Sequence, residues 1–342
     1  MSKLIVTLQP LEGYFRGAEN HLPYPQQTSV IKLIRYYVLL AWDKAFPEQN
    51  LLHGNGNIRN KELAKELIGE AGFSMSVTWR YGKIYSLSEM MLFDGKSVLL
   101  PAEIHNGSAM HTTPGLAFFN DKQLNYIPTL TDFNPKQPEK YGWISSSGQF
   151  FDVEELFMTE VKEGINENTF CNQVFFHMAD RDLRFVFQMD VDDDIHKTLV
   201  GQEVMSLGDD GSKFIVTVSP SEYFPFTIPE KSEKINYYSP DRKFIKLVLI
   251  SDAYFRGNPY HESVMGVTRL KPFCFIDSSV EMEEPESGQV KSKLLNLIER
   301  GSVFYFTDGN QLNRWSTSCG INSSDFRNIG YNQYVVIQPS KK

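Results

Sequence analysis

Short runs rich in apolar and β-branched residues recur along the chain, separated by stretches rich in Gly, Pro, Asn and Asp. Runs of this length and composition are typical of β-strands bounded by turns. The first run, 3–8, also alternates between apolar and polar positions, which predicts a strand with one buried face. The predicted strands cover residues 3–8, 97–104, 184–191, 213–218, 244–251, 302–306 and 334–338.

Apolar residues at helical spacing predict an amphipathic helix that begins near Thr28 or Ser29 as its N-cap. Its apolar stripe consists of Val30, Leu33, Ile34, Tyr37, Val38 and Ala41. Lys32 and Arg35 lie off this stripe, so both are expected to face solvent or a ligand. Two further helices are predicted, a short one closed by its own glycine and an amphipathic one. They cover residues 61–69 and 289–300.

Strand, helix and strand follow one another in two separate blocks, which predicts two α+β domains built on antiparallel sheets. The Pro-rich stretch 220–231 is the best candidate for a linker between them. The predicted domains are therefore residues 1–228 and residues 240–342. Residues 105–150 contain many Asn, Ser, Gly and Pro, and they are expected to form a large insertion in the first domain.

Composition excludes several classes of protein. Cys171, Cys274 and Cys319 are widely spaced and odd in number, so they predict neither a disulfide framework nor a metal site. The apolar stretch 4–8 is too short for a signal sequence. No segment approaches the roughly 20 apolar residues that a membrane-spanning helix needs. A cytoplasmic protein with buried thiols, no cofactor and no membrane partner is expected.

The charge is unevenly distributed. Residues 1–90 contain ten Lys and Arg against eight Asp and Glu, so their formal charge is +2. Because the net charge of the chain is −8, the remaining residues must carry −10. Non-specific coating of nucleic acid depends on neutralising phosphates, and the acidic balance argues against it. Any RNA contact is therefore expected near the N-terminal region, while acidic surface elsewhere could meet a basic protein partner.

The sequence Tyr-Phe-Arg-Gly occurs twice, at 14–17 and at 254–257, each time just beyond a predicted strand. In a functional interpretation, the glycine lets backbone approach a phosphate, the arginine supplies a cationic fork, and the aromatic rings offer stacking faces. In the alternative, each copy is a turn whose Tyr and Phe fill the core and whose Arg is solvated. Two copies in equivalent positions also suit duplication of one ancestral domain.

The start of the first helix offers another candidate site. Free backbone N–H groups at a helix N-terminus attract phosphate, and Gln26 and Gln27 could read a base edge or a sugar hydroxyl beside it. Ordinary capping of the helix by Thr28 explains the same residues equally well.

Several short stretches follow one another in a characteristic order: 8–17 (LQPLEGYFRG), 23–29 (PYPQQTS), 93–101, 163–166, 175–176, 184–190, 249–255, 300–306 and 326–332. In this order they resemble the CRISPR repeat-associated RAMP proteins across nearly the whole chain. The closest resemblance is to the third subunit of the type III-B, or Cmr, effector complex.

That resemblance implies two tandem ferredoxin-like (RRM-like) folds and a part in antiviral defence. It implies a non-catalytic subunit that binds the 5′ handle of the guide RNA (crRNA). The expected protein partners are the large polymerase-like subunit and the first backbone RAMP subunit. The residues expected to contact RNA are Tyr14, Phe15, Arg16, Gly17, Gln26, Gln27, Thr28, Lys32, Arg35, Tyr254, Phe255, Arg256 and Gly301.

Two alternatives remain open. A related RAMP branch cuts guide-RNA precursors without a metal, commonly with a histidine near the first helix, so His21 is the candidate general acid or base. Only Arg16 and Lys32 are plausible helpers for it, and a loop histidine that stacks or hydrogen-bonds is the simpler interpretation. The other alternative is a structural adaptor that binds only protein, which the acidic balance would suit.

Other polar clusters carry weaker signals. The acidic run Asp190, Asp192, Asp193 and Asp194 could bind a divalent cation, but it lacks the glycine and the terminal Glu of a calcium loop, so a solvated turn is the alternative. His105 and His111 flank a Ser/Gly/Thr loop without an identifiable nucleophile or orienting group, and they are expected to lie on the surface.

Overall fold

The computed structural model describes residues 1–15, 24–69, 81–96, 98–101, 142–143, 151–160, 169–207, 211–223, 234–237, 245–273 and 294–339. The chain forms two compact units, each assembled from separate segments. The first unit comprises Met1–Lys96, Ser146–Pro225 and Phe275–Ser292, and the second comprises Ser97–Ser145, Phe226–Cys274 and Lys293–Lys342. The predicted insertion, residues 105–150, lies almost wholly outside the described residues.

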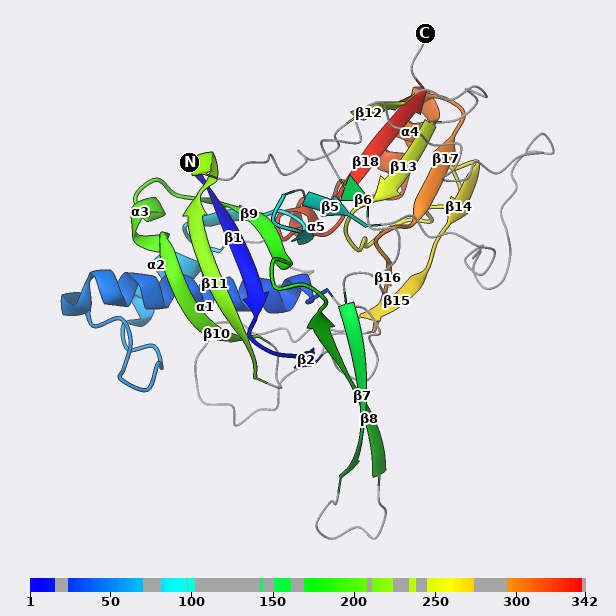
Figure 1. Ribbon diagram of the computed structural model, residues 1–342. Coiled ribbons are helices and arrows are strands. Elements are labelled where there is room, and N and C mark those ends of the chain that lie inside the picture. The colour runs from blue at the N-terminus through cyan, green and yellow to red at the C-terminus, as the bar shows by residue number, and fades with distance from the viewer. Residues whose placement is uncertain are drawn as a thin grey trace. The chain divides into compact units, whose positions relative to one another are not determined.

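The first unit is built on an antiparallel sheet (Figure 1). Its neighbouring strands are, in order, β10 (Gly201–Leu207), β11 (Ser212–Pro220), β1 (Ser2–Pro10), β9 (Arg184–Val191) and β4 (Met91–Phe93), and β3 (Ile84–Leu87) also pairs with β9. Strand β10 extends the sheet as a hairpin with β11. The other neighbours, β11, β1, β9 and β4, correspond in this order to the fourth, first, third and second strands of a βαββαβ unit. This is the order of the ferredoxin-like βαββαβ fold.

Helix α1 (Gln27–Ala45) crosses one face of this sheet (Figure 1). The predicted apolar stripe is confirmed, because Val30, Leu33, Ile34, Tyr37 and Val38 are buried and its last member, Ala41, is half-buried. The Tyr37 hydroxyl donates a hydrogen bond to the Leu199 carbonyl, 2.8 Å away, and so ties α1 to α3 (His196–Leu199). The second helix of the ferredoxin-like order is thus reduced in this unit to the four residues of α3.

The short helix predicted over 61–69 is also confirmed. Helix α2 covers Lys61–Ile68, and the Asn60 side chain caps it by accepting a hydrogen bond from the Leu63 N–H at 3.2 Å. Gly69 follows at φ +74°, a left-handed conformation that favours glycine. The 3-10 turn η1 (Pro47–Gln49) joins α1 to the loop before α2.

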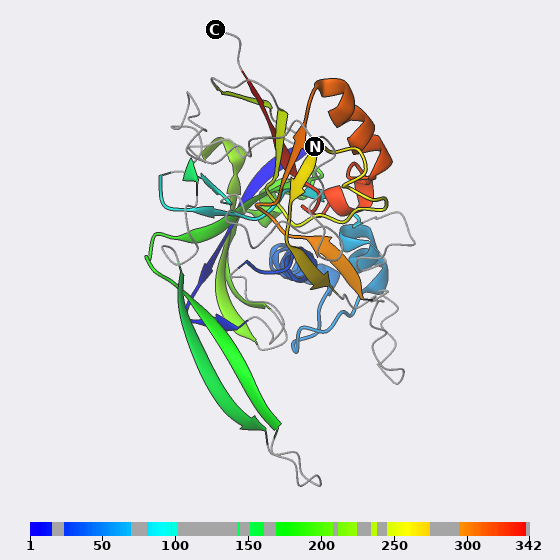
Figure 2. The ribbon, with the colours of Figure 1, turned by 90° about the vertical axis from the view of Figure 1, so that its right-hand side faces the viewer.

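A long hairpin lies in the chain between β4 and β9. Its strands β7 (Phe151–Glu160) and β8 (Thr169–Met178) pair antiparallel along their whole length and extend away from the rest of the first unit (Figure 2). The two-residue strand β2 (Tyr14–Phe15) pairs with the end of β8 nearest the sheet. The segment that follows β1 is therefore anchored to the base of this hairpin.

The second unit repeats the same strand order. Its sheet contains β12 (Lys234–Tyr237), β18 (Tyr334–Pro339), β13 (Ile245–Leu249), β17 (Val303–Phe306) and β14 (Met265–Val267), in that order. Apart from β12, which pairs parallel to β18, the fourth, first, third and second strands again lie side by side. The described residues 250–264 join the first strand to the second without a helix.

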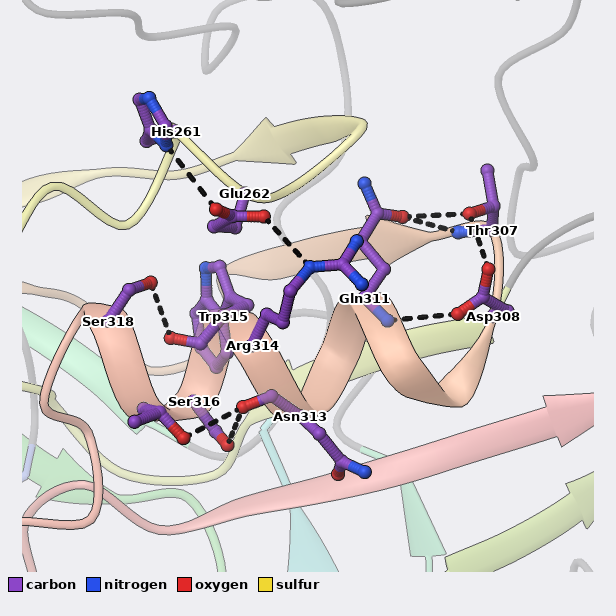
Figure 3. Close-up of polar contacts among 11 residues, drawn as sticks. His261, Glu262, Thr307, Asp308, Gln311, Asn313, Arg314, Trp315, Ser316 and Ser318 are labelled. Carbon is purple, nitrogen blue, oxygen red and sulfur yellow. Dashed lines mark hydrogen bonds and ion pairs between the residues drawn. The ribbon is translucent and has the colours of Figure 1, made fainter.

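Helix α4 (Gly309–Ser318) packs on this second sheet. Its Leu312 and Trp315 join a buried cluster with Leu247, Phe304 and Val336 from the strands. Figure 3 shows how the helix begins: the Asp308 carboxylate accepts from the Gln311 N–H at 2.9 Å, and the Gln311 side chain accepts from the Thr307 N–H at 2.7 Å. The short helix α5 (Ser324–Arg327) precedes β18.

The prediction of a helix over 289–300 is wrong where the structure describes it. Leu295–Ile298 form strand β16, which pairs antiparallel with β15 (Leu270–Phe273). A short segment with three apolar residues, Leu295, Leu297 and Ile298, fits a helix turn or a strand equally well, and the available strand partner decides. By contrast, α4 was not predicted, although Asp308 as N-cap and the helical spacing of Leu312, Trp315 and Cys319 signal it.

The remaining strand predictions hold with shifted ends, because β1, β9, β11, β13, β17 and β18 all lie within or around the predicted runs. Of the run 97–104, the structure describes β5 (Val98–Leu100), which pairs parallel with β6 (Gly142–Trp143) in the second unit. Among the described helices, none is long and apolar enough to cross a membrane.

Candidate nucleic-acid interface

Three loops of the second unit meet at one end of its sheet. Strand β13 runs antiparallel to β17 and β18, so the residues after β13 lie beside those that precede the other two strands. We call these loops, residues 250–258, 299–302 and 319–333, the loop edge. It contains four of the residues expected to contact RNA: Tyr254, Phe255, Arg256 and Gly301.

A buried ionic cluster supports the loop edge from within. The Asp252 carboxylate accepts from the Lys271 ammonium at 2.8 Å and from the Arg300 backbone N–H at 3.0 Å, and the Arg300 guanidinium lies 3.7 Å away. Burial alone would raise the pKa of Asp252, but the two cations outweigh it and hold that pKa well below the usual carboxyl range. Asp252 is therefore ionised and fixes the loop that follows it.

Asn332 joins two of the three loops of this edge, residues 250–258 and 319–333. It is fully buried at φ +58°, a left-handed conformation that Asn tolerates better than most residues. Its side chain accepts from the Tyr254 N–H at 2.7 Å and donates to the carbonyls of Tyr254 at 3.1 Å and Ile321 at 2.9 Å. Its backbone N–H donates to the Asp252 carbonyl at 3.0 Å. Sequence reasoning did not identify Asn332, because only the tertiary contacts reveal its role.

The second Tyr-Phe-Arg-Gly copy covers the C-terminal end of α4. The N–H groups of Arg256 and Gly257 both donate to the Cys319 carbonyl, at 3.0 and 3.2 Å. A Cβ atom at Gly257 would lie 2.4 Å from the Ser318 carbonyl oxygen, so only glycine fits without a shift. Both N–H groups thus satisfy the end of the helix, which favours the interpretation of this copy as a turn.

The three side chains of that copy have different surroundings. Tyr254 is half-buried and stacks on Phe326, with ring centroids 4.7 Å apart and planes inclined by 18°. Phe255 is also half-buried, and it packs edge-on against Phe304 and Trp315 of the core. The Arg256 side chain is 59% exposed and lies 3.6 Å from the Asp325 carboxylate. Arg256 is therefore the exposed member of this copy, and the ring of Tyr254, stacked on Phe326, is partly exposed.

Gly301 lies in the same loop edge but has a structural explanation. Its φ is +83°, and its N–H donates to the Leu249 carbonyl at 2.7 Å where β16 passes into β17. Two residues before it, Glu299 is buried, and burial raises the pKa of this carboxyl while Arg269, 3.4 Å away, opposes the rise. Gly301 thus allows the bend that brings Arg300 to Asp252.

The first Tyr-Phe-Arg-Gly copy is built differently. Tyr14 is only 2% exposed, and its ring contacts Phe176, Phe185 and Phe214 at centroid distances of 5.5 to 6.1 Å. The interpretation of Tyr14 as a core residue is therefore the one that the structure supports. Phe15 is described only as part of β2, and Arg16 and Gly17 lie outside the described residues.

The helix start beside that copy offers limited access. Helix α1 has Gln26 as its N-cap in place of Thr28 or Ser29, and no side chain caps it. Gln27 is 2% exposed, and its amide donates to the Ser88 carbonyl at 2.9 Å. Gln26 and Thr28 are half-buried. Gln27 thus holds α1 against the β3–β4 connection.

Lys32 and Arg35, the two residues of α1 that were expected to face solvent or a ligand, have different surroundings in the structure. Lys32 is exposed, as expected. The expectation for Arg35 is wrong: it is 9% exposed, and its guanidinium donates to the carbonyls of Ile68 at 3.1 Å and Gly69 at 3.2 Å while lying over the Tyr81 ring. Burial lowers the pKa of Arg35 from its usual value. Arg35 satisfies the C-terminal carbonyls of α2.

A histidine that the sequence did not single out lies at the base of the hairpin. His177 Nε2 is 3.1 Å from Glu154 Oε2, and the imidazole lies so close to Gly13 that a Cβ atom there would meet it at 2.4 Å. Its neighbours Tyr14 and Phe176 belong to adjacent paired strands. His177 and Glu154 form an oriented pair beside the first copy, and no sequence signal linked them.

The acidic run is explained by its contacts. Asp190 accepts from the Ser86 hydroxyl, Asp192 from the Tyr85 hydroxyl, and Asp193 from Ser2, while Asp194 pairs with Lys83. No group of His, Cys, Asp and Glu within the described ranges could hold a metal ion. These carboxylates tie the start of β1 and the residues of and before β3 to the end of β9 and the turn that follows it. His21, His105 and His111 lie outside the described residues.

Among known proteins, only solved structures are similar to this chain. No family model matches the chain, and no curated protein matches it. Among solved structures, a chain of type III-B Cmr-beta bound to cognate target RNA is similar, with a TM-score of 0.48, 10% identity, and coverage of 97% of this chain and 98% of that one. A second Cmr-beta structure, bound to cognate target RNA and AMPPnP, gives a TM-score of 0.44, 9% identity, and coverage of 98% and 99%.

A chain of the Csm3-Csm4 subcomplex in the type III-A CRISPR-Cas interference complex is also similar, with a TM-score of 0.35 and 12% identity. The matched region covers 89% of this chain and 94% of that one. Identities and TM-scores this low do not assign the chain to a family.

Proposed function

We propose that this chain is a non-catalytic subunit of a type III CRISPR effector complex, closest to the third subunit of the type III-B complex, and that it binds the 5′ handle of the guide RNA. Its protein partners would be the large polymerase-like subunit and the first backbone RAMP subunit. The single observation that carries the proposal is the repeated strand order. Both units place their strands in the ferredoxin-like order, as the sequence resemblance to RAMP proteins implies.

The contacts that could hold RNA are fewer than the sequence indicated. Lys32 and Arg256 remain as exposed cations, and Tyr254 remains as an accessible aromatic ring. Arg16 and Gly17 stay in the proposal from sequence alone. Tyr14, Gln27 and Arg35 act through the packing of the first unit. A binding surface with so few cations suits a short, defined segment of RNA better than a long non-specific track.

The direct test is to purify the tagged full chain from its native cells and to sequence the RNA and identify the proteins that accompany it. We expect a uniform repeat-derived 5′ end in the bound RNA, together with a large and a backbone subunit. The matched control is the double variant Lys32→Ala, Arg256→Ala, which should retain the proteins but less RNA. Partners without RNA would support the protein-only adaptor and contradict the proposal.

Absence of catalysis is part of the proposal and needs its own measurement. His177 and Glu154 form a histidine–carboxylate pair of the kind that general acid–base cleavage uses, and the sequence alone did not reveal it. Incubation of the purified chain with labelled precursor RNA, with and without Mg²⁺, should leave the RNA intact. Site-specific cleavage abolished by His177→Ala or His21→Ala would move the chain to the metal-independent endoribonucleases.

A further inference from the structure

We infer that Tyr254 is a fixed platform on which one unpaired RNA base stacks, and that Asn332 and Phe326 are the residues that position it. This inference rests on the proposed function and names the ligand of the loop edge: a single-stranded nucleotide. Neither Asn332 nor Phe326 carries a signal in the sequence that would have assigned it this role.

Tyr254 is held in place from two directions. Its ring lies nearly parallel to that of Phe326, with centroids 4.7 Å apart, and Phe326 in turn meets Tyr331 edge-on at 5.7 Å. Its backbone is held on both sides by one side chain, because Asn332 accepts from the Tyr254 N–H and donates to the Tyr254 carbonyl. Phe326 is 1% exposed and Asn332 is fully buried, so both supports belong to the core.

Such an arrangement has little conformational freedom to lose on binding. Ordering a side chain at an interface costs free energy, and a ring that is already fixed avoids most of that cost. Tyr254 keeps partial exposure despite its supports. A half-exposed, rigid aromatic ring is the element on which proteins stack unpaired bases, since every base has a flat apolar face.

The surroundings favour a nucleotide over an apolar ligand. Arg256 follows two residues later and is 59% exposed, so its guanidinium can contact a phosphate. The stem of Arg256 lies against Gly320, where a Cβ atom would be 3.2 Å from the arginine Cβ, which limits where the charge can lie. A base on Tyr254 and a phosphate at Arg256 together describe a single-stranded nucleotide.

The test uses the full chain and a fluorescein-labelled single-stranded RNA of the sequence that accompanies the protein. Tyr254→Ala should weaken binding about 5- to 150-fold, the range found when a stacked aromatic ring is removed. Tyr254→Phe should bind as the wild type does, because it keeps the ring. Tyr254→Leu keeps apolar contact with Phe326 without a flat face, and it should bind as weakly as Tyr254→Ala.

A scan of the RNA identifies the base directly. Replacing one nucleotide at a time by an abasic residue should weaken wild-type binding at one position, and at that position Tyr254→Ala should add no further loss. Asn332→Gly keeps access to the positive φ but removes the side chain's hydrogen bonds to Tyr254. Asn332→Gly should lower RNA affinity, and no single abasic position should then weaken binding more than the others. If Asn332 had a purely structural role, the variant would be less stable but the abasic scan would still show one sensitive position.

The outcomes separate this inference from the proposed function. If the wild type does not bind single-stranded RNA, the proposed function itself fails. If the wild type binds and Tyr254→Ala binds equally, with melting temperatures that show both are folded, the RNA-binding function stands and the platform is refuted. Additive losses for Tyr254→Ala at every abasic position would likewise refute it.

Discussion

The two units share one strand order but keep different helices. The first unit has a long helix after its first strand, α1, and only four residues of α3 after its third. The second unit has no helix in the described residues 250–264 after its first strand, and it has α4 after its third. The main helix on the sheet is therefore α1, after the first strand, in the first unit and α4, after the third strand, in the second.

That difference changes what the same motif does. In the first unit, β2 pairs with the hairpin strand β8 and turns Tyr14 into the core. In the second unit no helix follows the first strand, so the loop itself runs over the end of α4 and leaves Tyr254 half-exposed. The same tyrosine of the motif is thus buried in the first unit and partly exposed in the second, because the covering helix differs.

The strongest test of this comparison is to remove both tyrosines separately. Tyr14→Ala should lower the free energy of unfolding by about 3 to 5 kcal/mol, because it leaves a cavity among three aromatic rings. Tyr254→Ala should cost less than about 2 kcal/mol, since its ring is half-exposed. Urea denaturation of both variants measures the difference. Equal losses would show that both tyrosines are core residues.

A second test concerns the ionic cluster of the second unit, which has no counterpart among the described residues of the first. The pKa of Asp252 is lower folded than unfolded, so its stabilising contribution is full above the unfolded carboxyl pKa of about 4 and is lost as pH falls further. Asp252→Asn should destabilise by about 3 kcal/mol at neutral pH, because it leaves buried cations without their carboxylate.

Melting temperatures recorded between neutral and acidic pH check both parts of this prediction. The difference between wild type and Asp252→Asn should shrink as the pH falls below about 4. The exposed Asp193→Asn serves as the matched control in the first unit, and it should show no comparable loss at neutral pH. A constant difference at all pH values would mean that Asp252 is not ionised in the folded chain.

The loop glycines give a third, smaller contrast. Gly257→Ala should destabilise by about 1 to 3 kcal/mol, because the new methyl group meets a backbone carbonyl of α4. Gly13→Ala should cost under about 1 kcal/mol, since the group it meets is the His177 side chain, which can rotate. The double variant Gly13→Ala, His177→Ala should recover the stability that Gly13→Ala alone loses. If it does not, the loss comes from backbone strain and not from contact with His177.

The smallest expected effect concerns Arg256, whose side chain is 59% exposed. Arg256→Ala should weaken RNA binding by under about 1 kcal/mol, because the guanidinium is exposed and already near Asp325. The slope of log affinity against log salt should be shallow and should fall by about one unit in this variant. Arg16→Ala, in the first copy, should cost about 1.5 to 3 kcal/mol if that arginine binds a phosphate. A wild-type slope that indicates ten or more phosphate contacts would contradict the small binding surface.

The sequence alone determined the elements whose signals are local. The apolar stripe of α1, the glycine that ends α2 and the runs that form β1, β9 and β17 were all predictable from spacing and composition. It also indicated two α+β units through the repeated motif. The boundaries proposed for the two domains and the RNA contacts themselves remain predictions.

Tertiary structure decided everything that depends on a partner distant in sequence. Leu295–Ile298 became a strand because β15 was available to pair with it, and Arg35 is buried because the carbonyls that end α2 needed donors. Asn332 holds Tyr254 across 78 residues of chain. Local patterns fix which backbone conformation is favourable, whereas burial and hydrogen bonding depend on which groups the fold brings together.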